Sequence, residues 1–202
     1  AMNDRMDPSS AAHAGTLAAL VAAALATPDH EPAWDAAEQL AATLDTPEQV
    51  HSAYLRALAS AVSPDLASFL GQRAARFHDE WFEDPQSLVP ILDRVLALDP
   101  GAEWAFVRLV MIHTVWAQWD ELLALYERAL ENTSDPGRRA ELLDEAAHVA
   151  KDCAAQPDRA IDFMLQLQRL RPTDAQLATA LERLLERRER FADLVELWTQ
   201  RL

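Results

Sequence analysis

The apolar positions of the chain recur at helical spacing and end at proline. "LVPILDRVLALDP" (residues 88–100) and "AIDFMLQLQRLRP" (residues 160–172) each begin with an apolar residue that lies twelve positions before a proline. Steps of three and four residues between apolar positions place those side chains on one face of an α-helix. Proline ends such a helix because it has no amide proton to donate. The two stretches therefore predict helices of the same kind.

Longer stretches match at a constant offset of 72 residues. "WDELLALYERAL" (119–130) matches "FADLVELWTQRL" (191–202), and "DPQSLV" (84–89) matches "QPDRAI" (156–161). The first buried positions of these four helices become Leu88, Leu122, Ala160 and Leu194, at spacings of 34, 38 and 34. A period near 34 is typical of a repeated helix-turn-helix unit.

A second set of helices alternates with these four. Apolar spacing predicts them over 65–82, 102–117, 137–155 and 174–188. Proline and glycine separate the elements, at Ser63-Pro64, Pro100-Gly101, Asp135-Pro136-Gly137 and Arg171-Pro172-Thr173. Pro90 fits a helix only in its first turn, so we expect Ser87 to be the N-cap there.

Composition agrees with an all-α fold. The chain has 39 Ala and 30 Leu, which favour helix, and only four Gly. No segment alternates β-branched and polar residues with period two, as a strand would. The isolated glycines form no phosphate-binding loop, which excludes a P-loop or a dinucleotide fingerprint.

The pattern resembles the tetratricopeptide repeat (TPR), whose second helix carries an apolar residue, an aromatic four later, a small residue seven later and a proline twelve later. Leu122, Tyr126 and Ala129 follow this pattern, and Ala160 and Met164 begin a second instance. The resemblance implies a right-handed α-solenoid of antiparallel helix pairs, with about 11 helices in four to five TPR-like repeats. Stacking is needed because a single hairpin cannot bury its own apolar face.

The resemblance varies along the chain. It covers residues 65–202 well, and a weaker repeat over 33–63 follows from a step of 34 back from Leu88 to Tyr54. We expect an extra N-terminal helix over 16–27 and a disordered tail or cloning remnant over 1–15. Residues 16–202 then form a single TPR-like domain.

A stacked array of helices presents a groove, and the TPR resemblance implies that this groove binds a protein or peptide. The groove positions of the family's first helix, transferred to this chain, include aromatic, Met and Arg side chains, which are favoured at the centres of interfaces. The alternative for each aromatic is packing between neighbouring helices. The candidates are Arg73, Phe77, Trp81, Trp104, Arg108, Met111, Val115, Arg183 and Arg187. Three other tryptophans are expected in the core, namely Trp116, Trp119 and Trp198.

An enzyme remains the alternative, because two E-x-x-H sequences occur, at Glu48–His51 and Glu145–His148. Such pairs build carboxylate di-iron sites in four-helix bundles. Here each motif also has an ordinary explanation, since Glu48 lies in a first helical turn and His148 lies one turn from Asp152. We therefore expect no metal, no cofactor and no catalytic residue. A purely architectural segment of a larger protein is the third possibility.

Charge restricts the partners further. The net charge is −15, from 33 acidic and 18 basic residues, which repels nucleic acid and anionic membranes. Cys153 is the only cysteine, and no run of 18 apolar residues occurs, so we expect a cytoplasmic protein without membrane insertion. Abundant Ala and Arg with one Lys suggest a bacterial source. The apolar residues of the last helix need cover, which predicts self-association or continuation of the chain there.

Overall fold

The computed structural model describes residues 8–61 and 63–199, and all regular structure in this part of the chain is helical. It contains eleven α-helices, a 3-10 helix and a π-helical stretch. Their order is α1 Pro8–Ala26, α2 Glu31–Leu44, α3 Pro47–Ser60, α4 Pro64–Trp81, η1 Pro85–Leu88, α5 Val89–Leu98, α6 Glu103–Val115, α7 Trp119–Asn132, α8 Pro136–His148, η2 Val149–Cys153, α9 Pro157–Leu170, α10 Ala175–Arg187 and α11 Phe191–Thr199.

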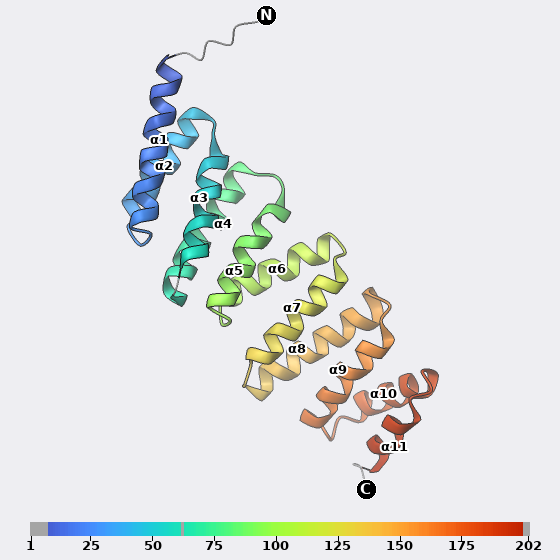
Figure 1. The fold of residues 1–202 in the computed structure, drawn as a ribbon. Coiled ribbons are helices and arrows are strands. Elements are labelled where there is room, and N and C mark those ends of the chain that lie inside the picture. Colours follow the sequence, from blue (N-terminus) through green and yellow to red (C-terminus); the bar gives the residue numbers. More distant parts are fainter. Residues whose placement is uncertain (1–7, 62, 200–202) are drawn as a thin grey trace, which may run out of the picture. The chain divides into compact units, whose positions relative to one another are not determined.

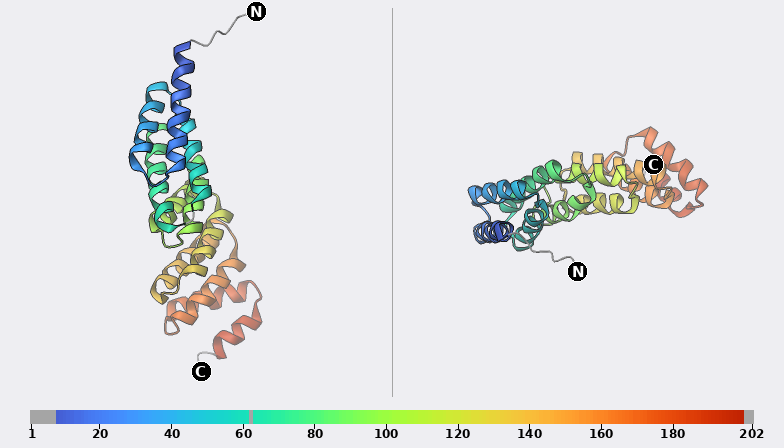
Figure 2. Two further views of the ribbon diagram at one scale, coloured as in Figure 1. Left: turned by 60° about the vertical axis from the view of Figure 1, so that its left-hand side comes forward. Right: turned by 90° about the horizontal axis from the view of Figure 1, so that it is seen from above.

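The chain divides into two compact units, Ala1–Ile112 and His113–Leu202. In the first unit, α1 packs on α2 and α3, and α3 packs on α2, α4 and α5. In the second unit, α8 packs on α7 and α9, and α10 packs on α9 and α11. Within each unit, consecutive helices run antiparallel and are joined by short connections (Figure 1 and Figure 2). Contact with near neighbours in sequence is the packing of an α-solenoid, so the predicted fold class is confirmed.

The repeat positions deduced from the sequence are buried in equivalent helices. Leu88, Leu122, Ala160 and Leu194 are each at most 4% exposed. Tyr126 and Met164, at the aromatic position of the repeat, are also buried. The second helix of each hairpin therefore presents the same apolar face to the interior.

The first helix begins earlier than predicted. The sequence indicated a tail over 1–15, but α1 starts at Pro8, and residues 1–7 lie outside the described residues. Proline is tolerated in a first helical turn, and the alanine-rich stretch that follows favours helix. Leu17 and Ala24 are completely buried, so α1 is anchored by one face on the neighbouring helices.

Three first helices of hairpins end with the same backbone motif. The φ angles of Asp45, Ala117 and Glu189 are 52°, 52° and 57°. Each is followed by an amide that donates to a carbonyl five residues back: Thr46 to Ala41 at 3.0 Å, Gln118 to His113 at 2.8 Å and Arg190 to Leu185 at 3.0 Å. This is a Schellman C-cap, made without the glycine that usually occupies it.

The end of α4 is different. Its C-cap Phe82 is extended, and the 3-10 helix η1 precedes α5. Pro90 lies in the first turn of α5, as predicted, but the N-cap is Leu88 and not Ser87. The Ser87 hydroxyl instead donates to the carbonyl of Asp84 and lies 2.7 Å from His78 Nε2. The turn between α4 and α5 thus differs from the turns that follow α2, α6 and α10.

Candidate functional site

The predicted groove residues of the first unit come from α4 and α6, and two contacts hold these helices together. The Arg108 guanidinium of α6 forms an ion pair with the carboxylate of Asp79 on α4. The indole ring of Trp104 lies against Gly71, where an added Cβ would be 3.1 Å from the ring. The same Cβ would collide with Val95 of α5. Gly71 therefore allows α4 to approach α5 and α6 closely.

One face of α6 is exposed and apolar. Val107 is 50% exposed and Met111 is 53% exposed, and Trp104 is half-buried beside them. The three residues lie at i, i+3 and i+7, so they share one face of the helix. We call Trp104, Val107 and Met111 the α6 stripe. The Trp104 ring extends from this stripe into the interior, where its Nε1 atom is buried. This atom has no hydrogen-bond partner among the described residues.

Arg73 and Phe77 were predicted in the groove, but both side chains are buried. Arg73 is 5% exposed and Phe77 is 2% exposed. The interior partners of these side chains explain the difference. Arg73 meets three carboxylates of α2, and the Phe77 ring lies 6.3 Å from that of Tyr54 on α3. The face of α4 that was predicted to line the groove is therefore turned toward the neighbouring helices.

The remaining candidates are at least partly exposed. Trp81 is half-buried, with its ring centroid 6.3 Å from that of Phe77. Val115, in the second unit, is 74% exposed. Arg183 and Arg187 are exposed on α10, also in the second unit. The candidates of the first unit that remain available to a partner are thus Trp81, Trp104, Arg108 and Met111.

Two of the three tryptophans predicted in the core are exposed. Trp116 is 52% exposed and Trp198 is 48% exposed, whereas Trp119 is half-buried. Trp198 lies on α11 with Phe191 and Val195, which are both 59% exposed. A helix whose outer face carries such residues has apolar surface left to bury.

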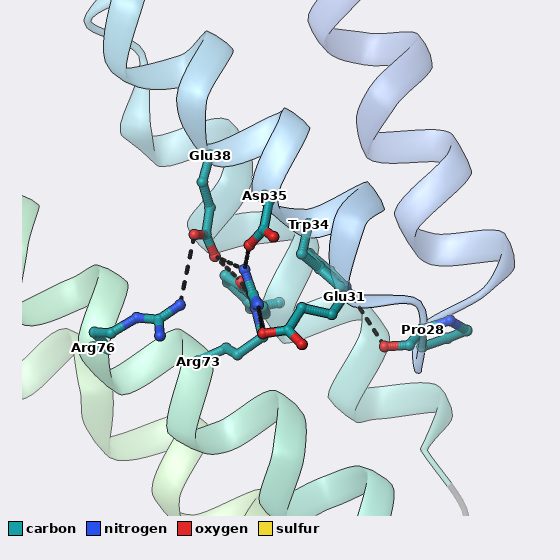
Figure 3. Close-up of polar contacts among 8 residues, drawn as sticks. Pro28, Glu31, Trp34, Asp35, Glu38, Arg73 and Arg76 are labelled. Carbon is teal, nitrogen blue, oxygen red and sulfur yellow. Dashed lines mark hydrogen bonds and ion pairs between the residues drawn. The ribbon is translucent and has the colours of Figure 1, made fainter.

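Arg73 is the centre of a polar network that joins three helices (Figure 3). Its guanidinium reaches three carboxylates of α2: Glu31 at 3.1 Å, Asp35 at 2.6 Å and Glu38 at 3.1 Å. Its Nε donates to the Tyr54 hydroxyl of α3 at 3.3 Å, and that hydroxyl donates to Glu38. The Tyr54 ring stacks on Trp34 with centroids 4.2 Å apart.

The pKa shifts follow from this geometry. Burial raises the pKa of Tyr54 well above its ordinary value, and the hydrogen bond to Glu38 adds to the effect. Burial alone would lower the pKa of the Arg73 guanidinium, but the hydrogen bonds to Tyr54 and Asp35 raise it overall. Arg73 therefore carries a permanent charge that holds together α2, α3 and α4.

The two E-x-x-H motifs lie in different units. Glu48 and His51 belong to the first unit, and Glu145 and His148 to the second. Glu145 accepts a hydrogen bond from Tyr126 at 3.0 Å, and His148 lies 2.9 Å from Asp152. In the described residues no group of three or more His, Cys, Asp or Glu has metal-binding geometry.

His51 instead belongs to an aromatic cluster. Its ring centroid lies 5.2 Å from that of Phe82 and 5.8 Å from that of His78. Burial lowers the pKa of His51, and the neighbouring His78 lowers it further. The His51 and His78 rings both pack on the Phe82 ring, beside the unusual α4–α5 turn.

Sequence reasoning missed Val107 and Gly71. Val107 could have been found, because it lies three residues after Trp104 and four before Met111, two groove candidates, and residues at these steps share one helix face. Gly71 could have been found from its place inside a helix, where glycine destabilises unless a neighbour approaches closely.

Comparison with known proteins gives similarity to solved structures only. No protein-family model matches the chain, and no curated protein matches it significantly. MamA from Desulfovibrio magneticus RS-1 is 20% identical over 83% of this chain and 90% of its own, with a TM-score of 0.37. Another MamA structure is 16% identical over 85% and 98%, with a TM-score of 0.39. The APC/C heterotetramer Cut9-Hcn1 is 18% identical over 88% and 34%, with a TM-score of 0.36.

Proposed function

We propose that this chain is a non-enzymatic scaffold that binds a protein or peptide partner on the exposed face of α6 in its first unit. One observation carries the proposal: Val107 and Met111 are half exposed on one helix face, with Trp104 and Arg108 beside them. Clustered exposed apolar residues mark interaction sites more often than scattered ones. Met, Trp and Arg are also enriched where interfaces are most tightly packed.

The chemistry of the rest of the described chain agrees with binding and not with catalysis. A cavity of about 570 Å³ in the first unit is open to solvent, and its lining of Asp29, Ser63, Asp65, Leu66 and Phe69 contains no His, Cys or Lys. No helix in the described residues is long and apolar enough to cross a membrane. We further propose a cytoplasmic location, no binding of nucleic acid, and one functional domain made of both units.

A second contact surface is supported by α11. Phe191, Val195 and Trp198 lie at i, i+4 and i+7 on this helix, and each is about half exposed or more. We propose that this face mediates self-association in the second unit, as α6 mediates partner binding in the first. Neither surface needs the other, so each can be tested alone.

Site-specific photocrosslinking tests the proposal. A photoreactive amino acid placed at Met111 in cells should give discrete protein adducts, whereas the same residue at Gln49, an exposed position of α3, should not. Adding Val107→Asp should abolish the Met111 adducts, because a charge would then lie within the apolar contact. Identical adduct patterns from positions 111 and 49 would rule out a specific site at α6.

A further inference from the structure

We propose that the occupant of the α6 stripe is a cationic amphipathic segment of the partner, with apolar residues on one side and Lys or Arg flanking them. This inference rests on the proposed function and adds the chemistry of the ligand. It is carried by two independent features of the first unit, its unpaired apolar surface and its strongly negative charge.

The apolar feature is the α6 stripe itself. A helix face with exposed residues at i, i+3 and i+7 matches the ridge of a second helix, which carries side chains at the same spacing. Met111 is unbranched and flexible, so it adapts to the shape of the side chain that it meets. Trp104, anchored against Gly71, supplies a rigid edge to the stripe.

The electrostatic feature is the scarcity of available cations. Residues 1–112 hold 16 acidic and 6 basic residues. Arg73 is occupied by three carboxylates, and Arg108 is paired with Asp79. Arg94 donates to the carbonyl oxygens of Leu58, Ala59 and Ala61 at 3.0 to 3.3 Å. These three arginines are held by partners within the unit. Arg56 and Arg76 are exposed, but the acidic residues of the unit outnumber its basic residues, so its surface is predominantly anionic.

Exposed carboxylates occur on both helices that carry the candidate residues. Glu103 precedes Val107 by one turn on the same exposed face of α6, and Glu80 follows Asp79, the residue of α4 that contacts Arg108. A ligand with a basic flank would meet these carboxylates while its apolar side covers Val107 and Met111. Complementary charge steers the encounter and selects against acidic competitors, and apolar burial supplies most of the affinity.

A second copy of this chain fits the stripe less well. Each copy carries a net charge of −15, so two copies repel each other at long range. The other exposed apolar face, on α11, belongs to a unit whose own charge is negative, with 17 acidic and 12 basic residues over 113–202. The negative charge that repels a second copy attracts a basic segment.

Binding of a labelled synthetic peptide tests the inference. The probe is an amphipathic helix of about 18 residues with Leu on one face and Lys on the flanks, and its twin has Glu in place of every Lys. The intact chain should bind the Lys peptide about tenfold or more tightly than the twin, with an affinity that falls as salt is added. Val107→Ser with Met111→Ser should weaken binding about fivefold or more, since apolar contact is lost without a change of charge.

A matched pair of charge variants separates a local site from general attraction. Glu80→Lys should weaken binding of the Lys peptide about threefold or more, and Glu121→Lys, the same change at an exposed site of the second unit, should leave it unaltered. Equal effects of the two variants, or no effect of the α6 serine variants, would overturn the inference. So would a dimer, seen by sedimentation, that the α6 serine variants dissociate.

The two proposals fail differently. Adducts from position 111 without any preference for the Lys peptide would leave the scaffold function standing and refute the cationic ligand. Binding of the Lys peptide at the stripe without adducts in cells would refute the scaffold function.

Discussion

Two buried tyrosines lie at corresponding places in the two units, but their partners differ in charge. Tyr54 of α3 and Tyr126 of α7 are 72 residues apart, the same offset that relates the matching stretches of the sequence. Each hydroxyl bonds to the side chain nineteen residues further along, on the next helix. For Tyr54 this is Arg73 at 3.3 Å, and for Tyr126 it is Glu145 at 3.0 Å.

The environment explains why one position accepts opposite charges. Arg73 is 5% exposed and needs the three carboxylates of α2, because a buried cation without partners is costly. Glu145 is exposed, so water can solvate its carboxylate. The repeats thus share backbone geometry and the buried tyrosine, while the partner's charge depends on what the preceding helix provides.

The largest expected effect comes from removing the cation of the first unit. Arg73→Met should destabilise that unit by about 2 kcal/mol, since Glu38 stays mostly buried without its partner while Glu31 and Asp35 remain partly solvated. Urea unfolding measures the change. Arg76→Met is the matched control, because Arg76 is exposed and 3.9 Å from Glu38, and it should cost about 0.5 kcal/mol or less. Equal losses from both variants would contradict a special role for Arg73.

The helices could be predicted from sequence, but the register of the first repeats could not. A step of 34 back from Leu88 aligned Tyr54 with the first buried position of the repeat. The shared bonding of Tyr54 and Tyr126 instead requires a step of 38, which places Val50 there. The two choices differ by four residues, and a shift of four keeps the same helix face buried. Val50, Tyr54 and Leu58 are all buried, so apolar periodicity cannot distinguish them.

The candidate site could be predicted from the sequence even less well than the register. The groove positions of α4 and α6 were transferred with the same register of the repeat. The connection after α4 contains a 3-10 helix and has no Schellman turn, unlike the connection after α6. Arg73 and Phe77 of α4 are buried, whereas Trp104, Arg108 and Met111 of α6 are at least partly exposed. Sequence spacing is thus informative only within a helix or across a connection of standard length.

Removing each tyrosine hydroxyl should have a smaller and unequal effect. Tyr54→Phe should cost about 1 kcal/mol, because it leaves Glu38 and Arg73 each one hydrogen bond short in a buried place. Tyr126→Phe should cost about 0.5 kcal/mol, because the exposed Glu145 can bond to water instead. Thermal unfolding of the two variants in parallel gives the difference. A larger loss at Tyr126 than at Tyr54 would invert the comparison.

Alkaline titration examines the two sites without disturbing the packing. The chain has only two tyrosines, so the ultraviolet absorbance of tyrosinate reports on these sites alone, and each Phe variant isolates the other. Burial raises the pKa of both hydroxyls, helped by Glu38 at Tyr54 and by Glu145 at Tyr126. A folded pKa above the unfolded value of about 10 means that stability is complete below pH 10 and is lost as the pH rises beyond it. Titration of either tyrosine at its ordinary pKa in the folded chain would contradict its burial.

The smallest expected effect is that of neutralising the partner in the second unit. Glu145→Gln should change stability by about 0.5 kcal/mol or less, because the amide oxygen still accepts from Tyr126 and the lost charge was solvated. The matched variant Glu38→Gln should cost more, since it weakens the bonds to both Tyr54 and Arg73 at a residue that is only 17% exposed. Urea unfolding of the pair measures the difference directly. A larger loss from Glu145→Gln would mean that the second unit depends on its carboxylate as the first depends on Arg73. The different exposure of Glu145 and Arg73 would then not explain the difference between the two tyrosine sites.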